Sequence, residues 1–289
     1  MSSWAEAPAA SGRRRRPRWT RSPMLLVGGA IVLMIMVVAL LSLVWTPHDI
    51  GIIDADSTLE TSSWEHWLGT DKYGRDVLTR IMVGSQTTLL VGIVAVGVAT
   101  LIGVPAGILA AMLPRWWGEL LMRGNDVLLA FPALLLAIML TAVRGQGVVT
   151  AMIAIGIASA PSFARVVRSG AIGVMKTEYV LAARCAGRRP LAIALRHVLP
   201  NVSSLIIVQA SIAFAIAVLA EAALSYLGLG APPGTPSWGR MLQEGQVLIY
   251  VAPRLEVFPG VAIALAVLGF NLLGDGLRDF VDPRLRDIS

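Results

Sequence analysis

The sequence has very little of what soluble enzymes use for chemistry. It holds a single cysteine, Cys185, and three histidines, His48, His66 and His197, that follow no metal-ligand spacing. An internal disulfide and a cysteine-based metal centre are therefore excluded. No Gly-Lys dipeptide occurs, so the chain lacks the phosphate-binding loop of P-loop nucleotide hydrolases. If a nucleotide drives this protein, we expect another subunit to bind it.

Charge is also scarce. Only 15% of the 289 residues are charged, against about 25% in an ordinary soluble domain. In contrast, 56% are hydrophobic and the mean hydropathy is +0.72. A soluble fold this apolar would expose large adhesive patches, so the composition predicts an integral membrane protein. In such a protein the net charge of +6 reports topology rather than binding to nucleic acid.

Long apolar runs predict an all-α membrane protein with six transmembrane helices. The first run, residues 23–45, is too long for a signal-peptide core and no small-residue cleavage site follows it, so we expect an uncleaved helix. A twin-arginine export signal is the alternative interpretation of the RRRR run before it. The other spans, each near the roughly 20 residues that cross a bilayer, are expected at about residues 85–113, 127–143, 147–163, 202–229 and 257–273.

Several prolines lie within or beside these runs, namely Pro105, Pro132 and Pro259. Membrane helices accept such prolines when neighbouring groups satisfy the freed carbonyls. The third and fourth runs are short, so we expect those helices to extend into the flanking sequence.

The basic residues predict that both termini are cytoplasmic. With the N-terminus inside, the outer segments hold only Lys72, Arg75, Arg80, Arg144, Arg240 and Arg254 of the 24 lysines and arginines, as the positive-inside rule expects. The expected organisation is a basic cytoplasmic tail that touches anionic lipid (1–22), a first helix (23–45), an external loop (46–84), a transmembrane core (85–276) with a cytoplasmic segment (164–201), and a cytoplasmic tail (277–289).

The cytoplasmic segment contains the stretch EYVLAARCAGRRPLAIALRHVLPN, residues 178–201. Good helix formers from about residue 169, a break at Gly187 and a helix-starting proline at Pro190 predict a helix, a turn and a second short helix. We expect Leu199 and Pro200 to end this second helix before the next span.

Two interpretations of this stretch remain open on composition. One is a basic interfacial loop held down by lipid. The other is a docking surface for a partner, which Ala182, Ala183 and Ala186 would allow to approach closely. A membrane-lying helix should carry bulky apolar residues where these alanines stand, which favours the partner. The surface is flanked by Arg184, Arg188, Arg189 and Arg196.

These residues resemble the EAA loop of ABC importer permeases, in the form EYVxAARxxG…RHxLPN of the peptide importers. Other stretches with the same resemblance are HWLGTDKYGRDVLTR, FPALLLAI, PSFARVVR, EAALSYLGLG, PPGTPSWGRML and FNLLGDGLRDFVDPRLR. The chain is similar to the dipeptide/oligopeptide/nickel importer permeases over about residues 23–288, and most similar to the C-chain type. Leu181 and His197 depart from the general loop pattern as the peptide branch does, so residue roles do not transfer from sugar or molybdate importers.

The resemblance implies a type I ABC importer permease fold and a non-catalytic subunit of the bacterial cytoplasmic membrane. Its implied partners are a second homologous permease, two ATP-binding subunits or one fused ATPase, and an external binding protein or lipoprotein. ATP and magnesium would be bound by the ATPase partners, with no cofactor in this chain. The loop residues expected to couple to the ATPase are Glu178, Tyr179, Ala182, Ala183, Arg184, Gly187, Arg196, His197, Leu199 and Pro200.

The implied activity is import of dipeptides or oligopeptides by alternating access, with nickel complexes, glutathione or haem as alternative cargo. A secondary transporter is a rival interpretation, but its ion coupling would need acidic or histidine residues near the membrane midplane, where the spans have almost none. A channel would need a selectivity element, and an integral enzyme would need a nucleophile–base or metal constellation. Neither is evident in the spans.

Three polar residues within the spans are candidates for function. Glu221 is costly to place in a membrane, so it is a functional candidate by default. Hydrogen bonding to Ser225, or to the partner permease, is its structural explanation. For Asn271, near the inner end of the sixth span, helix packing or capping is favoured over contact with substrate.

The external segments carry four further candidates. Asp71, Arg75 and Asp76 could form a local ion-pair turn that supports an outer gate, and direct contact with the binding protein is the alternative. Trp238 is expected to anchor its segment at the membrane interface.

Overall fold

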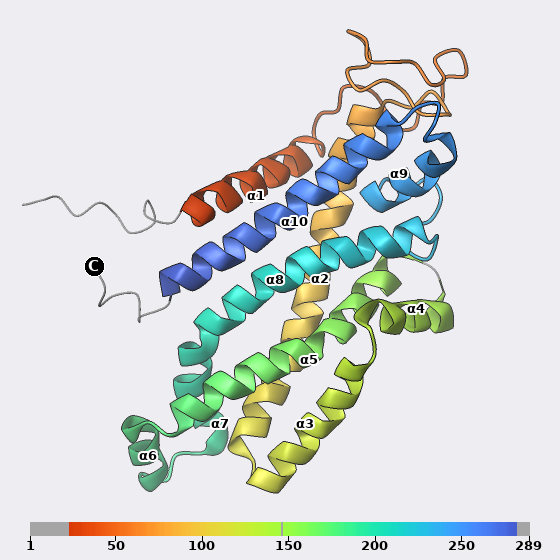
Figure 1. Cartoon of the computed structure of the whole chain (residues 1–289). Helices are drawn as coiled ribbons and strands as arrows, with labels where there is room; N and C mark the ends of the chain where they lie inside the picture. Colours follow the sequence, from red (N-terminus) through yellow and green to blue (C-terminus); the bar gives the residue numbers. More distant parts are fainter. Residues whose placement is uncertain (1–22, 146, 282–289) are drawn as a thin grey trace, which may run out of the picture.

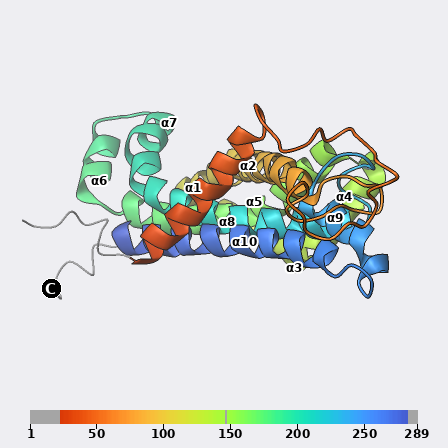
Figure 2. The same ribbon diagram turned by 90° about the horizontal axis from the view of Figure 1, so that it is seen from above.

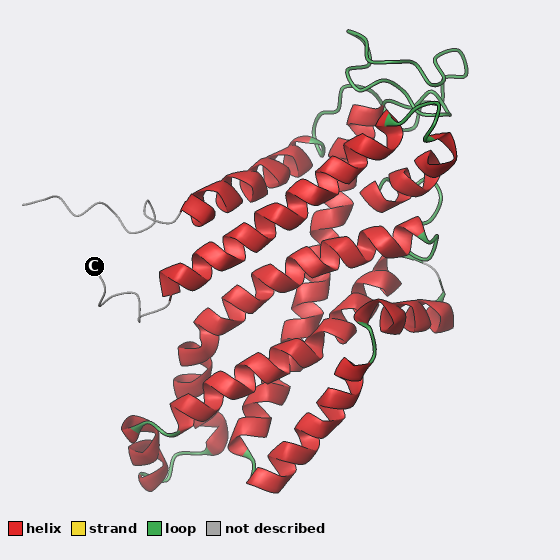
Figure 3. Cartoon of the chain, in the orientation of Figure 1, coloured by secondary structure: helices red, strands yellow, loops and turns green. Residues whose placement is uncertain are grey.

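The computed structural model describes residues 23–145 and 147–281. The basic tail predicted at 1–22 and most of the tail predicted at 277–289 lie outside the described residues. Within them the chain is helical, and its β structure is one isolated bridge between Thr70 and Asp76 (Figures 1 and 3). The predicted all-α class is confirmed.

Five helices of the described part are long and apolar enough to cross a membrane. They are α1 (Pro23–Leu41), α2 (Val77–Met112), α5 (Val148–Met175), α8 (Leu199–Tyr226) and α10 (Arg254–Val281). The shorter helices are α3 (Arg115–Ala130), α4 (Ala133–Arg144), α6 (Glu178–Cys185), α7 (Pro190–Ile193) and α9 (Trp238–Gly245), with a 3₁₀ turn at Gln246–Leu248.

The third predicted span is not one continuous helix. The chain bends by 85° between α3 and α4, inside the expected run 127–143. Pro132 causes the break, because proline lacks an N–H and forces the residue before it into an extended conformation, as Phe131 shows with ψ of 132°. The expected total of six spans is therefore reached only if α3 and α4 together form one bent crossing.

Helix bounds also differ from the apolar runs. α2 begins at Val77 rather than at residue 85, because Asp76 caps it: the Asp76 Oδ2 accepts a hydrogen bond from the Thr79 N–H at 2.7 Å. α5 continues to Met175, beyond the expected end at residue 163. Hydropathy detects the part of a helix that lies in lipid, and these helices extend past it at one end.

The helix pair α2 and α5 packs through two small residues. A side chain at Gly103 or Gly107 would collide with the α5 backbone at Ala160 and Ala164. This spacing of glycines four apart lets two membrane helices approach closely enough for extensive van der Waals contact. Around Phe163 the contact continues into a buried apolar cluster that reaches α8.

The two ends of the bundle differ in their contents. Figure 2 shows α6 and α7 at one end, together with the start of α1 and the end of α10, and residues 46–76 with α9 at the other. We call these the α6–α7 end and the α9 end. The segments predicted to be cytoplasmic and external thus gather at opposite ends.

Candidate functional site

The α6–α7 end is fastened to the bundle by buried apolar side chains. Val180 in α6 is fully buried, as are Ile193 and Val198 in the second half of the loop. All three join the apolar cluster formed by α2, α5 and the start of α8. The two short helices are therefore packed against the ends of the long ones rather than hanging free.

The opposite side of this loop is exposed over almost its whole length. Large apolar residues face outward there: Tyr179 and Leu181 are each 47% exposed, Leu195 57% and Leu191 69%. Exposed arginines surround them, namely Arg184, Arg188, Arg189 and Arg196. Apolar side chains ringed by charge are typical of a surface that a partner protein covers. We call this the α6–α7 surface.

The turn between the two helices is a Schellman motif with Gly187 at its left-handed position. Gly187 has φ of +72°, and its N–H donates to the Arg184 carbonyl at 2.9 Å. The Arg188 N–H donates to the Ala183 carbonyl at 3.1 Å. A Cβ on Gly187 would meet no atom within 4 Å. Glycine is thus favoured here by backbone conformation and not by lack of space.

Two features of the predicted helix–turn–helix are corrected. The first helix is not continuous from residue 169, because the chain breaks at Lys176 and Thr177 before α6 begins. Leu199 and Pro200 do not end the second helix. A π-helical turn (Ala194–Val198) joins α7 to α8, and the helix runs on without a loop. The wider turn accommodates proline, which has no N–H to donate.

The predicted coupling residues lie together in this loop. His197 packs near Tyr179, with ring centroids 5.9 Å apart. The Arg184 Nη2 lies 3.8 Å from the Met175 sulfur. The exposed members are Glu178, Tyr179, Ala182, Arg184, Gly187, Arg196 and Pro200, and the half-buried ones are Ala183, His197 and Leu199.

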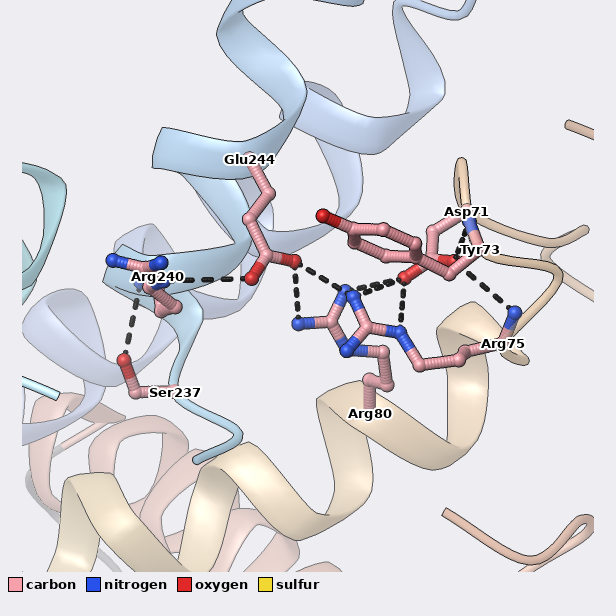
Figure 4. A network of polar contacts seen from close by, with 7 residues as sticks. All are labelled: Asp71, Tyr73, Arg75, Arg80, Ser237, Arg240 and Glu244. Atoms are coloured by element: carbon pink, nitrogen blue, oxygen red, sulfur yellow. Dashed lines mark hydrogen bonds and ion pairs between the residues drawn. The ribbon is translucent and has the colours of Figure 1, made fainter. Parts of the chain in front are cut away.

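The α9 end is held by a network of ion pairs (Figure 4). Asp71 Oδ2 accepts hydrogen bonds from Arg75 Nε at 2.8 Å and from Arg80 Nη1 at 2.7 Å. Glu244 Oε2 accepts from the Nη2 atoms of the same two arginines, each at 2.9 Å. These side chains are 5–14% exposed. The network therefore ties the loop before α2 and the start of α2 to α9.

Glu244 and Arg80 are the members of this network that sequence reasoning missed as site residues. Burial alone would raise the pKa of the Glu244 carboxyl, but Arg80 and Arg75 outweigh burial, so the pKa lies below its ordinary value of 4.5. Arg240 lies one helical turn before Glu244 and contacts it at 3.4 Å. That i, i+4 spacing was the available signal, whereas the pairing with residues 75 and 80 depends on the fold.

Asp76 does not belong to the ion-pair turn with which it was grouped. Its Oδ2 caps α2, and its Oδ1 lies 3.0 Å from His66 Nδ1. The Asp71–Arg75 pair was predicted correctly. The short turn from Asp71 to Arg75 is closed by the Asp71 Oδ1, which accepts hydrogen bonds from the backbone N–H groups of Tyr73 and Arg75.

Trp238 is buried rather than placed at a membrane interface. Only 2% of the residue is exposed, and its Nε1 donates to the Ile81 carbonyl at 2.9 Å. The ring lies against Gly84 of α2. Trp238 thus fixes the start of α9 to α2, a role that composition alone does not distinguish from an interface anchor.

The intramembrane candidates have separate environments. Glu221 is buried near the α9 end of α8, where Ser225 donates a hydrogen bond to it at 2.7 Å. Ser225 in turn accepts from the Ala231 N–H at 2.9 Å. This is the structural explanation expected for Glu221. Asn271 is exposed on α10 and lies apart from this pair.

Comparison with known proteins agrees with this architecture. The family described as "Binding-protein-dependent transport system inner membrane component" matches residues 103–287. The glutathione transport system permease protein GsiD of Escherichia coli is 41% identical over 270 residues, which cover 93% of this chain and 89% of that protein. The protein of the same name from Shigella sonnei has the same identity and coverage.

Among solved structures, an inward-facing form of the MetNI methionine ABC transporter aligns with a TM-score of 0.59 at 19% sequence identity. The alignment covers 70% of this chain and 97% of that one. At this identity the likeness concerns the fold, which is that of a type I ABC importer permease. Together with the long apolar helices, the family match means that the chain belongs to the binding-protein-dependent inner membrane components and is a permease subunit of a bacterial ABC importer.

Proposed function

We propose that this permease translocates short peptides, dipeptides or oligopeptides, across the cytoplasmic membrane. The observation that carries the substrate class is the 41% identity to GsiD over 93% of the chain. GsiD is named for glutathione, which is chemically a tripeptide, so glutathione is the second candidate cargo. Nickel complexes and haem have no such observation in their favour.

Coupling to ATP hydrolysis is proposed to enter through the α6–α7 surface. Its exposed Leu191 and Leu195 offer apolar contact to a cleft in an ATPase subunit, and the surrounding arginines offer pairing with acidic groups. Val180, Ile193 and Val198 join this surface to the long helices. Movement of the ATPase would therefore be passed to α5 and α8 as a rigid-body shift between two packed states.

The family implies ATPase and binding-protein partners, and we propose their composition. A second, similar permease would pair with this chain, either two ATP-binding subunits or one fused ATPase would dock at the α6–α7 end, and an external binding protein or lipoprotein would dock at the α9 end. Exposed aromatic residues support docking there, since Trp64 and Tyr250 are each 99% exposed and Trp67 is 64% exposed. In this arrangement the chain itself is non-catalytic, and its partners hold ATP and magnesium.

Transport is tested by reconstituting the complex in proteoliposomes and measuring ATP-dependent uptake of labelled cargo. The panel contains a dipeptide, a pentapeptide, reduced glutathione, a nickel complex and haem, each with its cognate binding protein. We expect saturable peptide uptake that unlabelled peptide abolishes. Uptake of only the nickel complex or haem would overturn the peptide assignment.

The proposed orientation places the α6–α7 end, and both termini, in the cytoplasm. The lone cysteine tests it directly, because Cys185 is exposed in α6. In permease expressed without ATPase subunits, a membrane-impermeant maleimide should label inverted vesicles but not intact spheroplasts. A Cys185→Ser, Trp64→Cys variant should give the reverse pattern. Labelling of Cys185 from the periplasmic side would refute the orientation.

A further inference from the structure

Two histidines that are far apart in the sequence meet in the external segment. His48 follows the end of α1, and His66 belongs to the loop that leads back to α2. Their ring centroids lie 4.4 Å apart with the planes tilted by 32°. Spacing along the chain predicted no metal centre, because the two residues flank a long loop and not a short motif. The fold brings them together.

A carboxylate completes the group. One ring nitrogen from each of His48 and His66 and one carboxylate oxygen of Glu65 lie within 4.8 Å of one another. Ligands about 2.0–2.1 Å from a tetrahedral Zn²⁺ are about 3.3 Å apart, so a small inward movement would close the set. Glu65 is exposed and free to make that movement. Two imidazoles and a carboxylate are a common ligand set for zinc, and imidazole also suits nickel and copper.

Asp76 is placed as a second carboxylate behind the ligands. Its Oδ1 lies 3.0 Å from His66 Nδ1, which leaves the other ring nitrogen of His66 for a metal. The Asp76 carboxylate is itself fixed by the Thr79 N–H at 2.7 Å. A carboxylate that orients the ligating histidine in this way accompanies most protein zinc sites and raises the basicity of the ligand.

An unsatisfied polar atom points to a missing partner. The Nδ1 atom of His48 is buried and has no hydrogen-bond partner among the described residues. The nearest carboxylate oxygen, on Asp76, is 3.8 Å away, beyond hydrogen-bonding distance. A buried ring nitrogen without a partner is costly in free energy. The His48 backbone is held in place, because its N–H donates to Thr79 Oγ1 at 3.2 Å.

We propose that His48, Glu65 and His66 bind a divalent transition metal, with Zn²⁺ as the reference ion and water in the fourth position. Asp76 acts as the positioning residue. The charges of Glu65 and Asp76 balance that of the ion. Because the ligands come from both sides of the loop, the metal fixes residues 65–66 to the junction of α1 and α2, on the face where a binding protein is proposed to dock.

The experiment uses the complete transporter complex, purified without a polyhistidine tag, stripped with chelator and titrated with Zn²⁺. Bound zinc is measured by mass spectrometry after gel filtration, and X-ray absorption reports imidazole scattering. Because partner subunits can bind zinc themselves, the readout is the difference between the wild-type complex and complexes that carry a single variant. The variants are Glu65→Gln, His48→Gln and His66→Gln, and His197→Gln, at the other end of the bundle, is the matched control.

We expect one zinc ion per complex to be lost in the His48→Gln and His66→Gln variants. In Glu65→Gln the affinity should fall at least 10-fold, and His197→Gln should match the wild type. Since Glu65 is exposed, its variant leaves the fold intact, and an unchanged affinity there would remove it from the ligand set. Zinc binding that none of the three variants alters, or an imidazole signal as strong in His48→Gln as in the wild-type complex, would overturn the proposal and leave a histidine pair that only supports Asp76.

Discussion

The two ends of the molecule satisfy their charged groups in different ways. At the α9 end, Asp71, Arg75, Arg80 and Glu244 are nearly buried and bind one another. At the α6–α7 end the arginines are exposed and stand beside exposed leucines. The charged groups of this network find their partners within the chain. The arginines at the α6–α7 end face solvent. The difference indicates that ion pairs within the chain maintain the geometry of the α9 end, and it supports the proposal that a partner covers the α6–α7 surface.

The largest expected effect comes from Gly187→Asp at the α6–α7 surface. A side chain at φ of +72° costs about 1–2 kcal/mol, and the new carboxylate would face the ATPase. We expect normal membrane insertion but no transport and no stimulation of ATP hydrolysis, measured in proteoliposomes. Gly187→Asn is the matched variant, because asparagine and aspartate both adopt the left-handed conformation more often than most residues but asparagine lacks the charge. It should keep part of the activity. Normal uptake by Gly187→Asp would contradict docking through this surface.

The next effect is expected for Arg80→Ala in the ion-pair network. The variant removes one hydrogen bond from each of the carboxylates of Asp71 and Glu244, and a hydrogen bond to a charged group contributes about 1.5–3 kcal/mol. Denaturation in mixed micelles, followed by tryptophan fluorescence, measures the loss. Arg165→Ala is the control. In its ion pair with Asp126 the side chain of Arg165 is 60% exposed and that of Asp126 is 55% exposed, so the pair should contribute little to stability. Equal stability of the two variants would mean that the network is not what holds the α9 end.

A smaller effect is expected in the middle of the bundle, from Gly103→Leu. The added side chain would push α5 away at Ala160, at a cost of about 1–3 kcal/mol for overpacking. Gly97→Leu lies on the same helix, where a Cβ would meet no atom within 4 Å, and should be tolerated. The same denaturation assay compares the two, and identical midpoints would argue against close packing of α2 on α5.

The smallest effect concerns pH at the α9 end. The folded state lowers the pKa of Glu244 below 4.5, so the ionised carboxylate stabilises folding above that value. This contribution is lost as the pH falls through the lower, folded pKa. Wild-type stability relative to Glu244→Gln should therefore be constant from neutral pH to about pH 5 and should decrease in more acid solution. If the stability of the wild type relative to Glu244→Gln instead increased as the pH falls, the arginines would not stabilise the carboxylate.

The sequence predicted the class of fold and most of the spans because lipid imposes a strong pattern on composition. It also predicted the turn between α6 and α7, since Gly187 and Pro190 have local conformational effects. It did not predict the bend at Pro132, because proline breaks some membrane helices and not others. Pro105, for instance, lies inside α2 without ending it.

Contacts between distant segments were beyond local reasoning. Glu244 joins Arg75 and Arg80 only because α9 folds back onto the start of α2. The pairing of His48 with His66 depends in the same way on how the loop between α1 and α2 folds. The burial of Trp238 likewise needs the position of α2. In each case the residue type was visible in the sequence, and its neighbour was not.

The helix that begins at Pro190 and ends at Tyr226 has a mechanical consequence. It runs for 37 residues without a loop, through the π-helical turn at Ala194–Val198, and it carries Leu191 near one end and Glu221 near the other. No non-helical segment separates its two ends. We expect a displacement of the α6–α7 end to pass through this continuous helix toward the α9 end, where the buried Ser225 donates a hydrogen bond to Glu221.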